Sequence, residues 1–269
     1  MRNLDAYLTR IGLSGEPTPA RVHRAHATSV PFENLDPRRG VPVSLSPEDL
    51  ERKLVSEHRG GYCFEQNLLL KSALEALGAE VELLLARVRV GAAPGVTRPR
   101  SHLVLRVAHE DQLWHADVGF GMGTLLEPIP FGPGEEHEQS GWRFRVVREG
   151  RELVLQTREQ ERWRDLYATV PEPVPLIDVE TANWWTSTYP GSPFVGGLMV
   201  SRRTDDGTSV TLSDWDGLGL TERTPAATTV TPVEADAVPG LLAERFALRG
   251  FVRLGDGRLI PEADERAAA

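Results

Sequence analysis

The chain has 269 residues, 40% of them apolar, and a formal net charge of -9. Such a length and composition suit a globular protein of one large or two to three small domains, while the acidic balance argues against binding of nucleic acid or of an anionic membrane surface. No apolar run reaches the roughly 18 residues of a membrane span, the N-terminus lacks the apolar core of a signal peptide, and a single cysteine cannot form an internal disulfide, so we expect a cytoplasmic protein without membrane partners.

The first third of the sequence predicts helices. Residues 4–11 form a short amphipathic segment, and residues 17–27 follow with Pro19 near their start. Ser46 and Pro47 are typical of a helix cap and a first helical turn. A fourth helix is expected from Cys63 to Gly78, where the glycine is a stop signal.

Cys63 is the only cysteine, and its surroundings favour a reactive sulfur. Two glycines at positions 60 and 61 allow a tight turn directly before the predicted helix. The free N–H groups and the positive dipole end of a helix start stabilise an anion such as a thiolate. A lone cysteine is more often a small buried hydrophobic residue, so the local pattern leaves both readings open.

The rest of the chain has mainly strand character. Strands are expected at residues 81–90, 102–107, 112–118, 142–147 and 153–156, with a loop at 91–100. Residues 174–194 are interpreted as a proline- and aromatic-rich connection. Further strands are expected near 197–202 and 209–212, a helix at 237–245, and a fraying tail at 262–269. Helices followed by strands and a mixed end predict an α+β fold with up to three lobes.

A thiolate nucleophile needs a histidine base, and His102 is the best candidate among seven histidines. It stands at the start of the apolar strand 102–107, where its side chain can face a cleft. His115 is an internal rival, and four other histidines are interpreted as solvated surface residues: His23, His26, His58 and His137. The seven histidines show no metal-ligand spacing. We therefore expect no metal site.

Hairpin geometry connects His102 with Asp117. If strands 102–107 and 112–118 pair, a two-residue loop at 109–110 places the two residues opposite each other, and a four-residue loop at 109–112 makes them diagonal neighbours on one face. Either arrangement puts the Cβ atoms about 4.5 to 8 Å apart, whereas a three-residue loop would put them on opposite faces. His115 lies two residues from Asp117 along one strand, which is poorer geometry for a hydrogen bond.

These residues predict a nucleophile, base and orienting acid in Cys63, His102 and Asp117. The N–H groups of the helix start would face a developing oxyanion. The chemistry is acyl transfer through a thioester, and the spacing alone does not separate a protease, a transglutaminase-like enzyme and an acyltransferase.

With these residues assembled, the sequence resembles the arylamine N-acetyltransferase family over roughly residues 1–205. The similarity rests on five segments in the family's order: VPFENLD at 30–36, RGGYCFEQN at 59–67, SHLVL at 101–105, DVGFG at 117–121 and ANWWTSTYPGSPF at 182–194.

The resemblance implies a helical domain at 1–79, a β-barrel domain at 80–195 and an α/β lid at 196–269, with a cysteine-protease-like catalytic core. It implies ping-pong transfer from acetyl-CoA to an aromatic amine or hydrazine, with no permanently bound cofactor. Phe32 and Phe120 match positions near the acceptor pocket, and Glu33 and Arg59 match an internal ion pair with a structural role.

Two features depart from the family pattern. Ser101 replaces the common threonine before the histidine, which is a mild change, and SDWDGLGL at 213–220 replaces a basic stretch of the lid. Since the lid contributes to CoA binding, an altered lid leaves open a second hypothesis, in which the protein is a macrolactam-forming amide synthase that takes a polyketide from an acyl carrier protein. A member that binds acyl thioesters without turnover and a hydrolase are further alternatives.

Trp184 and Trp185 could line the acceptor pocket or a packed domain junction.

Overall fold

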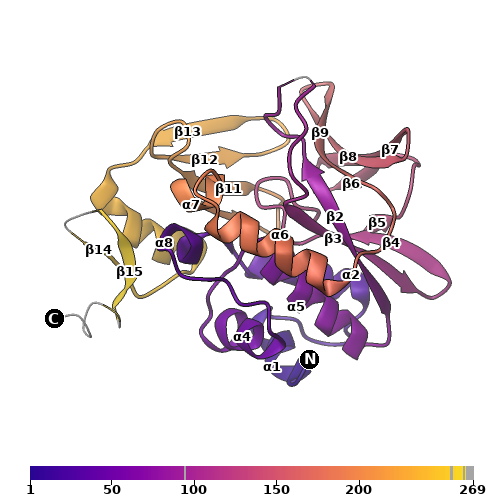
Figure 1. Ribbon diagram of the computed structural model, residues 1–269, viewed down its shortest axis with the longest axis horizontal. Helices are drawn as coiled ribbons and strands as arrows, with labels where there is room; N and C mark the ends of the chain where they lie inside the picture. The colour runs from indigo at the N-terminus through magenta and orange to yellow at the C-terminus, as the bar shows by residue number, and fades with distance from the viewer. Residues whose placement is uncertain (94, 255–256, 263, 265–269) are drawn as a thin grey trace.

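The computed structural model describes residues 1–93, 95–254, 257–262 and 264 (Figure 1). The first segment is helical, as predicted, and Asn3, Thr18 and Ser46 each cap a helix through a side-chain oxygen. Its helices are α1 (Leu4–Arg10), α2 (Pro19–Ser29), α3 (Leu35–Arg38), α4 (Pro47–Leu50), the π-helical turn η1 (Glu51–Ser56) and α5 (Cys63–Ala76).

An antiparallel, barrel-like sheet of eight strands follows, in the order β5-β4-β3-β2-β9-β8-β7-β6. Its strands are β2 (Glu80–Val88), β3 (His102–His109), β4 (Gln112–Ala116), β5 (Ile129–Pro130), β6 (His137–Gln139), β7 (Trp142–Glu149), β8 (Glu152–Glu159) and β9 (Arg162–Thr169). The five strands predicted in this region are confirmed, while β5, β6 and β9 were missed. The first half of β9 is rich in charged residues and gave no strand signal in the sequence. Hydrogen bonding to β2 on one side and β8 on the other holds this segment in the sheet.

The last segment builds a second sheet in the order β1-β10-β11-β12-β13. It contains β10 (Met199–Arg203), β11 (Ser209–Ser213), β12 (Gly219–Arg223) and β13 (Thr228–Pro232), followed by η2 (Ala235–Ala237), α8 (Val238–Phe246) and the hairpin β14 (Phe251–Arg253) and β15 (Leu259–Pro261). Its edge strand β1 (Phe32–Glu33) comes from the helical segment, and Phe32 pairs with Ser201. The α+β class with an α/β lid is confirmed. The segment 213–220 that departs from the family pattern contains the end of β11, the connection to β12 and the first two residues of β12.

The predicted domain limits meet the elements in different ways. The limit at 79/80 falls between α5 and β2, whereas the limit at 195/196 falls inside α7 (Pro193–Gly196). In the predicted fraying tail, residues 263 and 265–269 lie outside the described residues. Over the described ranges, no helix has the length and apolar character needed to cross a bilayer.

The connection predicted at 174–194 is wrong, because helix α6 (Leu176–Thr188) occupies most of it. Its prolines stand outside the helix: Pro175 precedes the first turn, and Pro190 follows the last. In Figure 1 this helix runs along the front of the molecule. Trp184 is 66% exposed, which contradicts a packed domain junction at that position.

The largest apolar core lies between α5 and strand β3. It includes Cys63, Leu70 and Leu74 from the helix and Leu103 and Leu105 from the strand. This packing brings the N-terminal end of α5 against the start of β3, which are the two places where the predicted nucleophile and base stand.

Candidate active site

The turn before α5 is held by close backbone contacts. A Cβ atom on Gly60 would lie 2.2 Å from the Pro31 carbonyl oxygen, so glycine is required there for close approach. The Gly61 carbonyl accepts the Glu33 N–H at 3.1 Å, and the Glu65 carboxylate accepts the Tyr62 N–H at 3.0 Å. Helix α5 therefore begins at Cys63, as the sequence predicts.

Cys63, His102 and Asp117 come together from the start of α5, the start of β3 and the segment directly after β4. Asp117 Oδ2 accepts a hydrogen bond from His102 Nε2 at 2.8 Å, and all three side chains are almost fully buried. Cys63 Sγ lies 3.7 Å from the Ser101 carbonyl oxygen, directly beside His102. Because Nε2 of His102 is bound to the acid, Nδ1 is the ring nitrogen left for the thiol.

The hairpin register explains why His102 reaches Asp117. Leu105 pairs with Ala116 and His109 with Gln112, which is the diagonal register among the predicted alternatives. The turn is shorter than the four residues expected for this register, since only Glu110 and Asp111 remain unpaired. Both have positive φ, at 50° and 59°, as a type I′ turn requires.

Opposite charges stabilise the His102–Asp117 pair. Burial alone would lower the pKa of His102, but the Asp117 carboxylate and the Cys63 side chain raise it from 6.5 to about 10. Burial would raise the pKa of Asp117, yet His102, Asn67 and the Gly119 N–H together keep it below its usual value. His102 is therefore an imidazolium at neutral pH, poised to give a proton to a leaving group.

Asn67 lies on the same helix as Cys63 and holds Asp117 through hydrogen bonds. Its side-chain amide donates to Asp117 Oδ1 at 2.9 Å and to the Leu103 carbonyl at 2.7 Å, and its oxygen accepts the Val118 N–H at 3.0 Å. The sequence contained a signal for this role, because Asn67 stands four residues after Cys63 and so shares its helix face. Gly119 completes the contact, since a Cβ atom there would lie 2.7 Å from Cys63 Cα.

Aromatic side chains surround the three residues. The Phe120 ring meets the His102 imidazole edge-on, with centroids 5.1 Å apart. Phe32 lies 5.9 Å from Phe194, and Phe194 also contacts Tyr62 at 6.0 Å, the residue before Cys63. Of the two predicted acceptor-pocket residues, Phe120 therefore contacts His102 directly, and Phe32 is connected to Tyr62 through Phe194, a neighbour for which the sequence prediction assigned no role.

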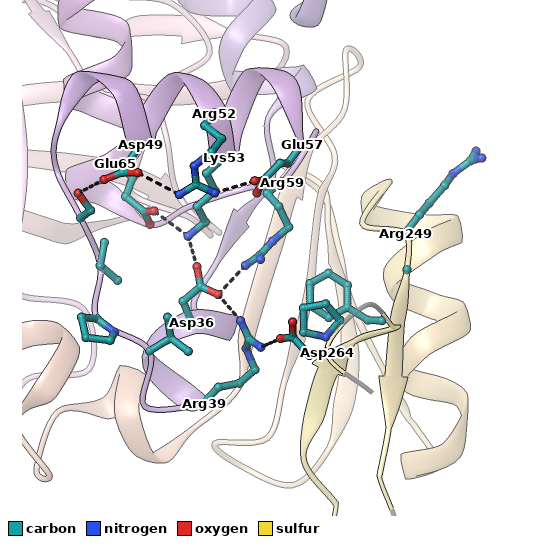
Figure 2. Close-up of a pocket in the computed structure, with 17 residues that line it drawn as sticks. Asp36, Arg39, Asp49, Arg52, Lys53, Glu57, Arg59, Glu65, Arg249 and Asp264 are labelled. Carbon is teal, nitrogen blue, oxygen red and sulfur yellow. Dashed lines mark hydrogen bonds and ion pairs between the residues drawn. The ribbon is translucent and has the colours of Figure 1, made fainter. Parts of the chain in front are cut away.

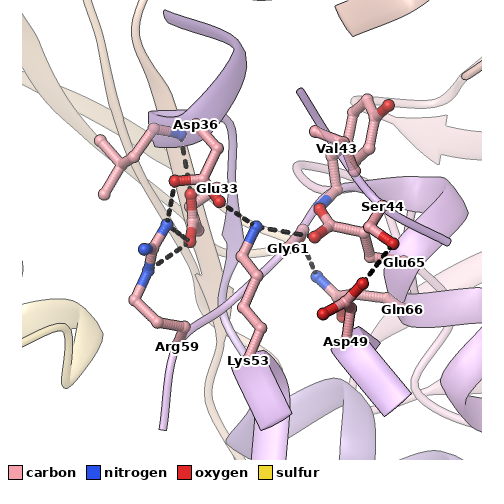
Figure 3. Close-up of polar contacts among 12 residues, drawn as sticks. Glu33, Asp36, Val43, Ser44, Asp49, Lys53, Arg59, Gly61, Glu65 and Gln66 are labelled. Atoms are coloured by element: carbon pink, nitrogen blue, oxygen red, sulfur yellow. Dashed lines mark hydrogen bonds and ion pairs between the residues drawn. The ribbon is translucent and has the colours of Figure 1, made fainter. Parts of the chain in front are cut away.

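A network of buried charged side chains lies next to the glycine turn that precedes α5 (Figure 3). Arg59 Nη2 lies 2.6 Å from Glu33 Oε1, which is the predicted ion pair, and 3.1 Å from Asp36. Lys53 Nζ bridges Asp36 at 2.6 Å and Glu65 at 2.7 Å. Burial would lower the pKa of Lys53, but these carboxylates raise it, so the ammonium stays charged. The network fixes Glu65, which in turn holds the Tyr62 N–H.

A charged cavity of about 460 Å³ borders this network. Figure 2 shows its lining: Asp36, Lys53 and Arg39 point toward one another, while Arg249 points away. None of the residues Cys63, His102 and Asp117 lines this cavity, so it is separate from the predicted chemistry. Within the described ranges, no group of three or more histidine, cysteine, aspartate or glutamate residues could hold a metal ion.

The surface assignment of His23 and His26 is wrong, because both side chains are fully buried in α2. His26 Nδ1 lies 2.8 Å from the Tyr7 hydroxyl oxygen. His23 bonds to the 117–126 loop at both ring nitrogens. Hydrogen bonds at both ring nitrogens of His23 and at Nδ1 of His26 offset the cost of burying these rings, and such partners lie too far away in sequence to be foreseen. His58 is exposed and His137 is partly exposed.

We expect the free energy of unfolding to fall as the pH drops from 6.5 toward 4. Burial lowers the pKa of His23 and His115 to about 4 and that of His26 to about 3, so in this window the unfolded state binds up to three more protons. Glu65, whose pKa burial raises, opposes this by at most one proton. The loss is about 3 to 4 kcal/mol per pH unit at its steepest.

Urea unfolding at pH 6.5, 5.5 and 4.5 checks this expectation. His102 opposes this loss near pH 6.5, where the unfolded histidine is half protonated and the folded one, whose pKa is raised to about 10, is fully protonated; below about pH 5.5 both states are protonated and His102 contributes nothing further. A flat stability profile from pH 6.5 to 4.5 would mean that the three histidines are solvated.

The comparisons with known proteins agree on one family. A family model described as N-acetyltransferase matches residues 18–250. The arylamine N-acetyltransferase of Mycolicibacterium smegmatis is 44% identical over 213 residues, which are 76% of this chain and 78% of that protein. The arylamine N-acetyltransferase of Mycobacterium tuberculosis strain H37Rv is 34% identical over 258 residues, which are 91% of this chain and 89% of that protein.

The similarity to a solved structure also includes the C-terminal segment 196–269, which was predicted to form the lid. The Mycobacterium marinum arylamine N-acetyltransferase in complex with CoA has a TM-score of 0.86 and 34% identity, and the match covers 91% of this chain and 93% of that one. Coverage of this extent includes most of the 196–269 segment, where the sequence pattern departs. The chain therefore belongs to the arylamine N-acetyltransferase family.

Proposed function

We propose that this protein transfers the acetyl group of acetyl-CoA to an aromatic amine or hydrazine through a thioester on Cys63. The observation that carries the proposal is the meeting of Cys63, His102 and Asp117 at the start of α5, with 2.8 Å between His102 Nε2 and Asp117 Oδ2. This is a cysteine-protease-like arrangement of nucleophile, base and orienting acid. Family membership supplies the donor, acetyl-CoA, and the acceptor class.

In the first half-reaction the Cys63 thiolate attacks the acetyl carbonyl carbon. The new S–C bond forms, the bond to the CoA sulfur breaks, and the His102 imidazolium gives its proton to the departing CoA thiolate. Free N–H groups of the first turn of α5 face the oxyanion of the tetrahedral intermediate. Asp117 keeps the His102 ring oriented throughout.

In the second half-reaction the amine nitrogen attacks the acetyl-Cys63 carbonyl. The N–C bond forms, the C–S bond breaks, and neutral His102 takes the proton from the amine, which restores the thiolate–imidazolium pair. Phe32 and Phe120 offer aromatic surface to the acceptor ring, and the Glu33–Arg59 pair has a structural role in the turn. The mechanism needs a free thiol, which a reducing compartment such as the cytoplasm maintains.

The amide-synthase alternative has no support from the comparisons, since the relatives and the structure described above are arylamine N-acetyltransferases. The same relatives disfavour a hydrolase or a binder without turnover. The amide-synthase hypothesis arose from the altered lid sequence at 213–220. This segment lies at the ends of β11 and β12, and the pairing of these two strands is regular.

Intact-protein mass spectrometry tests the proposal. After brief incubation with acetyl-CoA, we expect a single acetyl adduct on the protein, which disappears when an anisidine is added and appears as the acetylated amine. If the acetyl adduct disappears as fast without anisidine as with it, water is the acceptor and the protein is a hydrolase. Labelling from an acyl carrier protein thioester, but not from acetyl-CoA, would favour the amide synthase.

A further inference from the structure

His23 is joined to the catalytic acid, although it lies 94 residues earlier in the chain. Its Nε2 accepts the backbone N–H of Asp117 at 3.1 Å, and its Nδ1 donates to the Leu126 carbonyl oxygen at 3.1 Å. The side chain is fully buried. One imidazole therefore bonds to both ends of the loop formed by residues 117–126.

These two bonds define the state of the ring. An N–H group can only donate, and a carbonyl oxygen can only accept, so His23 must be neutral with its proton on Nδ1. Burial supports this, because it lowers the pKa of His23 to about 4. Protonation of Nε2 would remove the acceptor and place two donors against each other.

The loop held by His23 carries much of the site. Asp117 begins it, Gly119 packs on the Cys63 backbone, and Phe120 lies beside His102. The Thr124 hydroxyl also donates to the Asp117 carbonyl at 2.8 Å, so a hydrogen bond within the loop connects its first part with its last. Movement of the Asp117 backbone would shift its carboxylate away from His102.

We propose that His23 is a positioning residue: its neutral, Nδ1-protonated imidazole fixes residues 117–126 and thereby keeps the Asp117 carboxylate on His102. The inference rests on the proposed function for its consequence in catalysis. Its geometric part, the tautomer and the effect on Cys63 reactivity, can be tested without acetyl-CoA.

Two substitutions test the two hydrogen bonds of His23 one at a time. In His23→Gln, the side-chain oxygen can occupy the place of Nε2 and accept the Asp117 N–H. In His23→Asn, the shorter amide can occupy the place of Nδ1 and donate to the Leu126 carbonyl, but nothing accepts the Asp117 N–H. The control is His26→Asn, which alters an equally buried histidine one turn along α2 that contacts Tyr7 and Gln66 but has no hydrogen bond to the 117–126 loop.

The measurement is the rate of Cys63 alkylation by iodoacetamide between pH 5 and 9, together with the melting temperature of each variant. We expect His23→Asn to slow alkylation at pH 7 by about 10- to 100-fold, as misplacement of a catalytic group does, and kcat for acetyl transfer to fall by a similar factor with little change in KM. His23→Gln should stay within about threefold of the original protein. His26→Asn should lower the melting temperature and leave alkylation unchanged.

Equal rates for the Asn and Gln variants of His23, or a loss in His26→Asn as large as in His23→Asn, would overturn the proposal. If the His23 variants do not fold, ring ¹⁵N spectra of the original protein decide: a His23 that carries its proton on Nε2, or is charged at pH 7, contradicts it. Absence of an acetyl adduct with a normal alkylation profile would instead count against the proposed function alone.

Discussion

Replacement of the nucleophile by Cys63→Ala is expected to abolish acetyl transfer while the fold stays intact. Loss of the attacking sulfur removes both half-reactions, so the rate should fall on the order of 10⁶-fold, as when a triad nucleophile is removed. The side chain is 3% exposed and small, and its removal leaves a void worth only about 1 kcal/mol of unfolding free energy. The measurements are acetyl-CoA-dependent loss of free anisidine, the acetyl adduct by mass spectrometry, and the melting temperature.

Cys63→Ser is the matched control for this variant. It keeps the volume and the polar atom beside the Ser101 carbonyl, but a hydroxyl is a far weaker nucleophile than a thiolate at neutral pH. We expect the serine variant to be as stable as the original protein and nearly inactive. Turnover by the alanine variant above a few per cent of the original rate would remove Cys63 from the mechanism.

The substitution Asp117→Asn is expected to lower kcat by about 10⁴-fold with little effect on the fold. Asp117 Oδ1 accepts two hydrogen bonds, from the Asn67 amide and from the Gly119 N–H, both at 2.9 Å. The oxygen of the introduced amide must stay there, so its NH₂ group faces His102. Nε2 of His102 must then accept, its proton moves to Nδ1, and the ring can no longer take a proton from Cys63 or from the amine.

Steady-state acetylation, with the pH profile of Cys63 alkylation, measures this effect. With the original protein, alkylation should proceed at pH 6 to 7 without an inflection near 6.5, because the pKa of His102 is raised to about 10. The variant should lose this protonated imidazole. The control is Asp206→Asn in the exposed turn after β10, which should leave kcat unchanged. An Asp117→Asn variant with full activity would mean that another group orients His102.

The three side chains that we propose to react could be located from the sequence because each has a strong local signal. Cys63 follows a glycine turn and starts a helix, His102 opens an apolar strand, and Asp117 lies where the partner strand runs into a glycine turn. Hairpin pairing is a short-range interaction, so the register could be limited to a few alternatives before the structure was known. The choice among them depended on the turn at Glu110 and Asp111, whose backbone conformation the sequence pattern did not specify.

Other parts of the site had no local signal. The exposed or buried state of His23 depends on the 117–126 loop, which is about 100 residues away in sequence. Helix α6 was missed because prolines before and after it dominated the composition of the whole stretch. The partners of Lys53 likewise come from separate turns and helices, and a lysine in an amphipathic segment normally faces solvent.

By itself, the sequence determined the α+β class, the place of Cys63 at a helix start and the places of His102 and Asp117 at one hairpin, because helix caps, glycine turns and strand pairing are encoded by neighbouring residues. Only the tertiary structure decided which face of α2 is buried, how Asn67 and His23 hold Asp117, and how β1 joins the helical segment to the lid sheet. Those features arise from packing between distant segments, where burial and hydrogen bonding select one arrangement that no local pattern distinguishes.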